Sequence, residues 1–212
     1  MKRGTSISPS AAPWLLAVVF GALAVTVLAL YLTSRPPADD SAEAGFARDM
    51  MVHHAQAVEM AEILRDKPVS PRMQTLAKDV SLTQQAQIGQ MQGWLAVWRL
   101  PMTGAEPAMA WMGHPTTGRM PGMATPEEIE ALREASPEQA ERRFLQLMIP
   151  HHQAAVPMAE AVLDETDRPE VRRLAEGIIA SQKAEIEVMR EMLEDRGAKP
   201  EGGSSSHRGH HH

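Results

Sequence analysis

The sequence has 212 residues, with 21 Lys and Arg against 27 Asp and Glu, and it contains no cysteine. This length suits one or two domains, and the net charge of −6 argues against a nucleic-acid-binding protein with a basic surface. The lack of cysteine excludes disulfide bonds, thiolate zinc sites, iron–sulfur clusters and a cysteine nucleophile. Aromatic residues make up only 4%, whereas there are 15 methionines, a composition that favours an all-α fold.

The amino terminus predicts a membrane anchor. Residues 1–13 carry Lys2 and Arg3 and precede an uncharged apolar run, residues 14–32. A helix of that length, at about 1.5 Å per residue, nearly spans a hydrocarbon core of about 30 Å. A removed signal peptide is the alternative, although its apolar region is usually shorter and ends at a small-residue cleavage site. We interpret the run as a transmembrane signal anchor with a cytoplasmic amino terminus, which places the bulk of the chain in the periplasm or at the cell surface.

Two polar segments flank the remaining domain. Residues 33–43 are rich in proline and acidic residues and predict a linker. Residues 197–212 are rich in Gly and Ser, contain four histidines, and predict a disordered tail that is either native or an added sequence. The folded domain is therefore expected over residues 44–196.

This domain contains an internal duplication. A shift of 98 residues superimposes residues 46–95 on 144–193 with eighteen of fifty positions identical and no insertion. The identical pairs include Met50/Met148, His53/His151, His54/His152 and Met60/Met158. Each copy predicts a helical hairpin, so unit one (44–98) and unit two (126–196) together predict a ferritin-like four-helix bundle.

Local signals predict the helix ends. Proline at the first helical position follows Ser70, Thr125 and Ser136, each of which is a candidate N-cap. Pro150 and Pro157 each remove a backbone hydrogen bond, so a kink or a break is expected near the second histidine pair. The expected helices cover 44–65, 71–98, a short 126–135, 137–165 and 169–196.

Both His-His pairs lie on the helix faces that should be buried, together with Met and Ala. Gln84 and Gln182 also lie within apolar stripes. Burying an imidazole without a partner costs about 1–3 kcal/mol, so this arrangement requires an explanation. One interpretation is a structural network of His, Gln and backbone carbonyls with Met as filler. The other is a metal site, and the residues alone leave both open.

Imidazole and thioether donors suit copper, particularly Cu(I), whereas carboxylate-rich sites suit iron, manganese or magnesium. A ferritin-like di-iron site needs Glu-x-x-His on two helices, but Glu59 aligns with Pro157, and Glu62 and Glu160 lie outside the buried stripe. The predicted metal ligands are Met50, His53, His54, Met60, Met148, His151, His152 and Met158.

The loop of residues 100–125 is rich in methionine. Its secondary candidates for metal binding are Met109, Met112, His114, Met120 and Met123, with two Met-x-x-Met spacings. Thioethers can hold Cu(I) in an oxidising compartment, where thiols would be consumed, so the loop is expected to act as a solvent-facing exchange arm. The alternative is a loop that folds back over the bundle with Met and Trp111 as its contacts.

The segments Met50–Ala61 and Met148–Ala159, with Gln84, Gln182 and their neighbours, resemble the bacterial family catalogued as domain of unknown function 305. The resemblance covers residues 44–196 and implies a ferritin-like bundle in exported or membrane-anchored proteins, some of which bind copper through Met and His. Carried over by motif, it points to the same eight ligands. Val52 stands where Pro150 stands in the second copy, so the two halves need not be equivalent.

The sequence therefore predicts an extracytoplasmic, membrane-anchored protein that sequesters or transfers copper. Its expected partners are a metal ion, the membrane and a possible protein for metal exchange, and no nucleic acid. No nucleophile–base pair, phosphate loop or carboxylate dyad is present, so no enzyme is expected. Two alternatives stay open: a helical interaction module of the envelope with a structural histidine network, and a metal-dependent redox protein.

Overall fold

The computed structural model describes residues 12–33 and 35–197. These residues form six α-helices, one 3₁₀ turn and a single isolated bridge between Ala108 and Thr116, and no strand, which confirms the all-α class. They divide into two compact units between Pro37 and Ala38. Residues 1–11 of the predicted amino-terminal segment 1–13, and the four histidines of the predicted tail 197–212, lie outside the described residues.

The first unit contains helix α1 (Ala12–Thr33), which has no charged residue. Within residues 14–28 its large apolar side chains, including Trp14 and Phe20, are exposed. Within residues 12–33 and 35–197, no helix combines the length and the hydropathy needed to cross a membrane.

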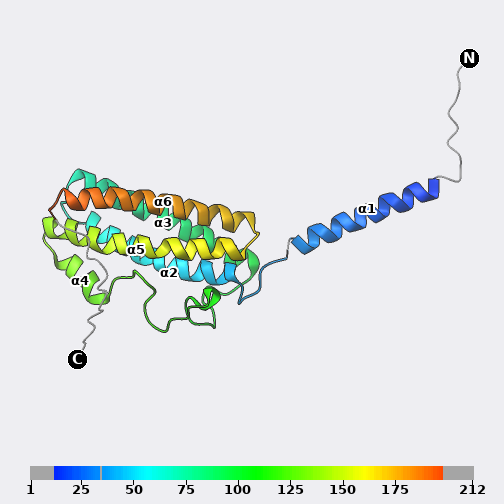
Figure 1. Ribbon diagram of the computed structural model, residues 1–212, viewed down its shortest axis with the longest axis horizontal. Helices are drawn as coiled ribbons and strands as arrows, with labels where there is room; N and C mark the ends of the chain where they lie inside the picture. The colour runs from blue at the N-terminus through cyan, green and yellow to red at the C-terminus, as the bar shows by residue number, and fades with distance from the viewer. Residues whose placement is uncertain (1–11, 34, 198–212) are drawn as a thin grey trace, which may run out of the picture. The chain divides into compact units, whose positions relative to one another are not determined.

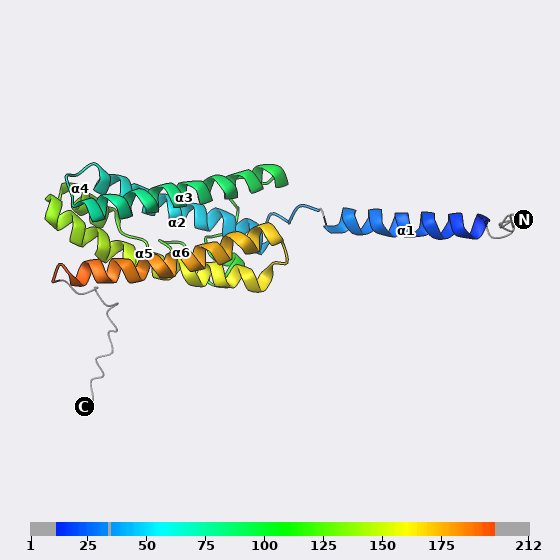
Figure 2. The ribbon, with the colours of Figure 1, turned by 90° about the horizontal axis from the view of Figure 1, so that it is seen from above.

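The second unit is a bundle of four long helices arranged as two hairpins (Figures 1 and 2). The elements are α2 (Ala42–Arg65), α3 (Pro71–Trp98), η1 (Ala110–Met112), α4 (Pro126–Glu134), α5 (Pro137–Glu165) and α6 (Pro169–Glu194). Helix α3 packs on α2, α6 packs on α5, and α2 and α5 lie antiparallel to each other where the two hairpins meet. The duplicated prolines Pro71 and Pro169 begin α3 and α6, so the two hairpins have matching layouts.

Most helix ends agree with the local signals. The predicted capping boxes at Thr125 and Ser136 are both formed. Helix α2 begins two residues earlier than predicted because the Ser41 hydroxyl accepts a hydrogen bond from the backbone N–H of Ala44. Ser70 precedes α3 but makes no side-chain cap, and its hydroxyl instead accepts a hydrogen bond from Arg196. Helix α5 continues through both of its prolines, so of the two outcomes predicted there, a kink or a break, the break is wrong.

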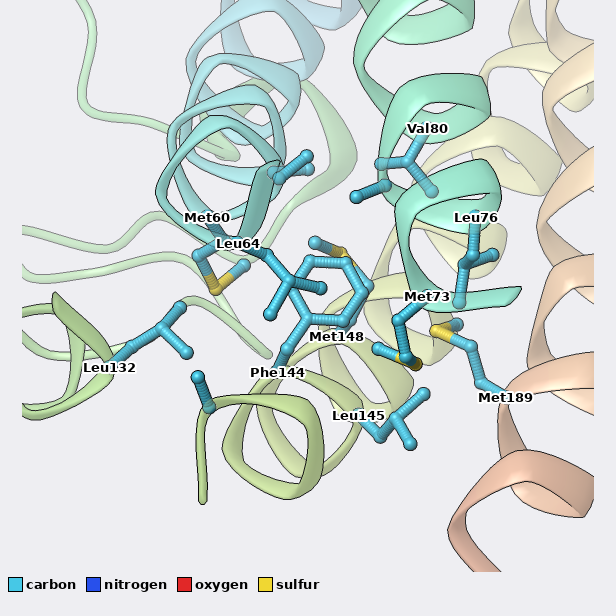
Figure 3. Packing of buried hydrophobic residues seen from close by; sticks show 14 of the residues in the cluster. Met60, Leu64, Met73, Leu76, Val80, Leu132, Phe144, Leu145, Met148 and Met189 are labelled. Carbon is cyan, nitrogen blue, oxygen red and sulfur yellow. The ribbon is translucent and has the colours of Figure 1, made fainter. Parts of the chain in front are cut away.

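The interior of the bundle has three layers. Two hydrophobic clusters lie at its two ends, and each takes residues from α2, α3, α5 and α6. Figure 3 shows part of the first cluster, where Phe144 from α5 lies among Leu64 and Met60 of α2 and Met73 of α3. Between the clusters lies a set of buried residues that belongs to neither, which we call the polar layer. It consists of His53, His54, Gln84, His151, His152 and Gln182.

Candidate metal centre

The polar layer is fully enclosed. All four histidines have 0% exposure, and the two glutamines have 2%. The helical period and the duplication explain this arrangement, because each His-His pair occupies the inward stripe of α2 or α5, and each glutamine the inward stripe of α3 or α6. The predicted burial of these six residues is confirmed.

His53 and His151, the first histidines of the two copies, lie against each other. The ring centroids of His53 and His151 lie 3.8 Å apart with an interplanar angle of 41°, and those of His151 and His152 lie 6.3 Å apart. Because consecutive helical residues point about 100° apart, His54 and His152 are directed away from the central pair toward α3 and α6. Two of the four imidazoles, those of His53 and His151, therefore lie against each other at the centre, while His152 contacts Glu185 of α6.

Most of the imidazole nitrogens make no hydrogen bond. Six of the eight have no protein partner, including both nitrogens of His54 and of His151. In the exceptions, Nε2–H of His53 donates to the carbonyl oxygen of Pro121 over 3.2 Å, and Nε2 of His152 lies 2.6 Å from Oε2 of Glu185. The amide of Gln84 is also unpartnered. The satisfied His–Gln network considered from the sequence is therefore not formed among the described residues, and the layer presents several unused lone pairs.

Burial keeps His53, His54 and His151 neutral. It lowers the pKa of His53 to about 4 and the pKa of His54 to about 3, and repulsion from neighbouring imidazoles acts in the same direction. Burial also lowers the pKa of His151 well below its usual 6.5. A neutral imidazole can donate a lone pair to a metal ion, whereas a protonated one cannot.

The predicted core methionines flank the polar layer on both sides. Met50 and Met158 belong to one hydrophobic cluster, and Met60 and Met148 belong to the other. All four have at most 1% exposure. Because α2 and α5 are antiparallel, the two copies place one methionine from each helix on each side of the imidazoles. The eight predicted ligands thus lie in one core, with the imidazoles between two layers of thioethers.

The loop of residues 100–125 lies along α2. Oδ2 of Asp49 accepts hydrogen bonds from the N–H of Met109 and from Nε1–H of Trp111, at 2.7 and 2.8 Å. The side chain of Gln56 makes two hydrogen bonds with the backbone of Ala124, at 2.7 and 3.0 Å. Together with the bond from His53, these contacts hold the loop at three points spaced along one face of the helix.

The loop methionines are packed rather than solvent-facing. Met109 and Met120 are buried in the second hydrophobic cluster, and Met112 and Met123 are half-buried against it. His114 is exposed and lies outside the polar layer. The expectation of a free exchange arm is wrong for the buried pair, since apolar contacts with the bundle stabilise the folded-back loop.

Gly122 allows the loop to approach the second histidine pair. Its φ is +75°, and a Cβ placed there would lie 2.5 Å from the carbonyl oxygen of Pro150 and 3.1 Å from Cα of His151. We expect Gly122→Ala to destabilise the loop by about 2 kcal/mol or more, because both the left-handed backbone and the contact are unfavourable. Hydrogen exchange over residues 119–124 measures the effect. Gly118→Ala is the control because its Cβ has ordinary space, and equal exchange in both variants would contradict the close packing.

Carboxylates contribute little to the layer. Among the described residues, no group of three or more His, Asp or Glu side chains is arranged to hold one metal ion. Glu185, which the sequence did not single out, is the carboxylate that touches a layer histidine. A metal site in this core therefore has to combine pairs of imidazoles with the neighbouring thioethers.

The fold and the layer define a class of protein: a duplicated helical bundle with paired histidines and methionines across its centre. The chain belongs to the family described as Domain of unknown function (DUF305), which matches residues 43–193.

Solved structures of this family are similar to the chain. A candidate secreted protein from Streptomyces coelicolor is 45% identical, with a TM-score of 0.75 over 78% of this chain and 100% of that one. CopM in its Cu(II)-bound form is 34% identical, with a TM-score of 0.58 over 73% of this chain and 97% of that one. CopM in its Cu(I)-bound form is 30% identical, with a TM-score of 0.54 over 73% and 96%.

A curated relative matches a shorter segment. The uncharacterized protein L153 of Acanthamoeba polyphaga mimivirus is 38% identical over 56 residues, which are 26% of this chain and 37% of that protein. The match thus spans little more than a third of the relative.

Proposed function

We propose that the protein binds copper as Cu(I) within the polar layer and sequesters or transfers it. The observation that carries the proposal is the set of six buried imidazole nitrogens without a protein partner, between layers of buried thioethers. An unpartnered polar group in a core is costly, and a bound metal ion would satisfy several at once. The CopM structures, which include Cu(I)-, Cu(II)- and Ag-bound forms, support this choice of metal.

The donor set favours Cu(I) over harder ions. Zinc, iron and manganese sites usually need three or more nitrogen or oxygen ligands, and such a group is not found among the described residues. Cu(I) accepts two or three soft ligands, so an imidazole pair with one thioether suffices. In this proposal Cu(I) is held by two or three donors at a time. These donors are drawn from His53, His54, His151, His152, Met50, Met60, Met148 and Met158. The loop methionines Met109, Met112, Met120 and Met123, with His114, are secondary ligands.

We also propose that the protein works outside the cytoplasm and is anchored through α1. The apolar run of residues 14–32, the exposed apolar side chains of α1 and the secreted description of the Streptomyces relative support this location. The finding that no described helix meets the length and hydropathy of a membrane span stands against the anchor. Separation of cell membranes from soluble extracts tests it: recovery of the intact chain in the soluble fraction would refute the anchor without affecting copper binding.

Competition with a colorimetric Cu(I) chelator tests the metal site. The reference protein is the full chain with His207, His210, His211 and His212 changed to Ala, so that these residues cannot supply ligands. Changing the four layer histidines to Gln, which keeps polar side chains of similar size, should abolish competition while circular dichroism shows the helices retained.

Methionine variants add a matched control. Met50→Leu and Met158→Leu should weaken competition, whereas Met73→Leu, at a buried methionine of α3 distant from the layer in sequence, should not. If the reference protein competes no better than the variant without layer histidines, the structural alternative holds. Metal-dependent turnover of a phenol or of ferrous ion would instead favour the redox alternative.

A further inference from the structure

His54 and His152, the second histidines of the two copies, have different neighbours on the adjacent helix. In the second copy, Nε2 of His152 lies 2.6 Å from Oε2 of Glu185 on α6. The residue 98 positions earlier is Gln87 on α3. In the first copy the side chain of Gln87 opposes the lowering of the His54 pKa by burial. However, Oε1 of Gln87 and both nitrogens of His54 make no hydrogen bond. At this equivalent position of the two copies, the first copy therefore has the amide of Gln87 and the second has the carboxylate of Glu185.

The contact with Glu185 selects one tautomer of His152. A carboxylate accepts hydrogen bonds and cannot donate them, so in the neutral form of this imidazole, the form that can bind a metal, the proton lies on Nε2. Its lone pair is then on Nδ1, which is buried and has no protein partner. An imidazole held by a carboxylate in this way is fixed in orientation and is a stronger electron-pair donor to a metal. An amide can donate or accept, so Gln87 imposes no such choice on His54.

We propose that Glu185 is a positioning residue that fixes His152 as the Nε2–H tautomer and makes the second copy the stronger half of the metal site. The part that concerns metal affinity rests on the proposed copper-binding function. The tautomer itself is a property of the metal-free protein and rests only on the contact between the two side chains.

The place of Glu185 allows it to be changed without disturbing the core. Its side chain is 21% exposed and lines a cleft of about 370 Å³ between α3 and α6. Thr75 and Asp79 of α3 and Val188 of α6 line the same cleft. Gln87 lines a second cleft between these helices. Both positions thus reach from the surface to the polar layer, and Glu and Gln have nearly the same shape.

The test exchanges the two residues in the full chain with the tail histidines replaced. The variants are Glu185→Gln, Gln87→Glu and the double exchange. In the metal-free reference protein, nitrogen-15 chemical shifts of the imidazole of His152 should report a single Nε2–H tautomer. Glu185→Gln should produce a mixture of tautomers and weaken Cu(I) binding about 10- to 100-fold. The double exchange should fix the tautomer of His54 instead and recover most of the affinity, which a merely structural role of Glu185 would not allow.

The outcomes separate the two proposals. A mixed or Nδ1–H tautomer of His152 in the reference protein would overturn the role of Glu185, whatever the protein binds. A tautomer change in Glu185→Gln with unchanged Cu(I) affinity would overturn the inequality of the two halves. A fixed tautomer in a reference protein that never competes for Cu(I) would overturn the proposed function and support the positioning role.

Discussion

Replacing His54 and His151 together with leucine is expected to stabilise the metal-free protein by about 2–4 kcal/mol and to abolish its Cu(I) binding. These two imidazoles are fully buried, and none of their four nitrogens makes a hydrogen bond. Each unpartnered polar group in a core costs about 1–3 kcal/mol, so removing it returns that free energy, less some strain from the new shape. In a domain of this size the gain corresponds to a rise in Tm of roughly 5–15 °C.

The matched control replaces the other two histidines. His53→Leu with His152→Leu removes the hydrogen bonds to Pro121 and Glu185 and leaves a half-buried carboxylate without its partner. This pair should lose Cu(I) binding as well, but without a gain in stability. Urea or thermal unfolding of both double variants without metal measures the difference. Equal changes in the free energy of unfolding of the two double variants would show that all four imidazoles are equally satisfied in the metal-free protein. That result would contradict the finding that His54 and His151 have no hydrogen-bond partner.

This contrast describes a core in which function and stability oppose each other. Leucine at the layer positions would join the two hydrophobic clusters into one apolar interior. That interior would make the metal-free protein more stable. The protein instead keeps polar groups that only an additional ligand can satisfy. A bound ion would recover the lost free energy through mass action, so copper is expected to raise Tm in the natural sequence and to leave the His54/His151 variant unchanged.

The sequence was sufficient to predict the parts of the fold that depend on periodicity. The inward stripes of α2 and α5 are spaced at helical intervals and occur twice, so the burial of His53, His151 and their methionines followed directly. The capping boxes were equally predictable because they depend on residues three positions apart.

The path of the loop could not be predicted. His53 and Pro121 are 68 positions apart, and no period relates a Pro- and Gly-rich segment to the helix that it covers. The burial of Met109 depends on Asp49 as a distant acceptor, a contact that composition does not reveal.

Glu185 was missed although a signal was present. It lies three residues after Gln182, hence near the same side of α6, and it replaces the amide of Gln87 in the aligned copy. Attention to the polar mismatches between the copies, rather than to the identities alone, would have found it.

Acidification should unfold the metal-free protein at a higher pH than its carboxylates alone would dictate. The pKa of His53 is lowered by burial to about 4 and that of His54 to about 3, whereas an unfolded histidine titrates near 6.5. Between these values the unfolded chain binds protons that the folded chain does not, so stability is complete above about pH 6.5 and falls as the pH decreases. Each such histidine contributes a slope of up to about 1.4 kcal/mol per pH unit, and His151 adds to it in the same direction.

Buried histidines and carboxylates lose their contributions to stability in different pH ranges. A hydrogen bond from Ser81 lowers the pKa of Glu62 below 4.5, so its contribution is lost only in more acidic solution. Unfolding free energies measured from pH 7.5 to 4 should therefore decline from about pH 6.5. The decline should be much shallower in His54→Leu/His151→Leu, which keeps one of the three depressed histidines. A wild-type stability that stays flat down to pH 4.5 would mean that the imidazoles are solvated, and the ligand layer would then lose its physical basis. Cu(I) should delay acid unfolding in the wild type alone, because protons reach the buried nitrogens only after the ion has left them.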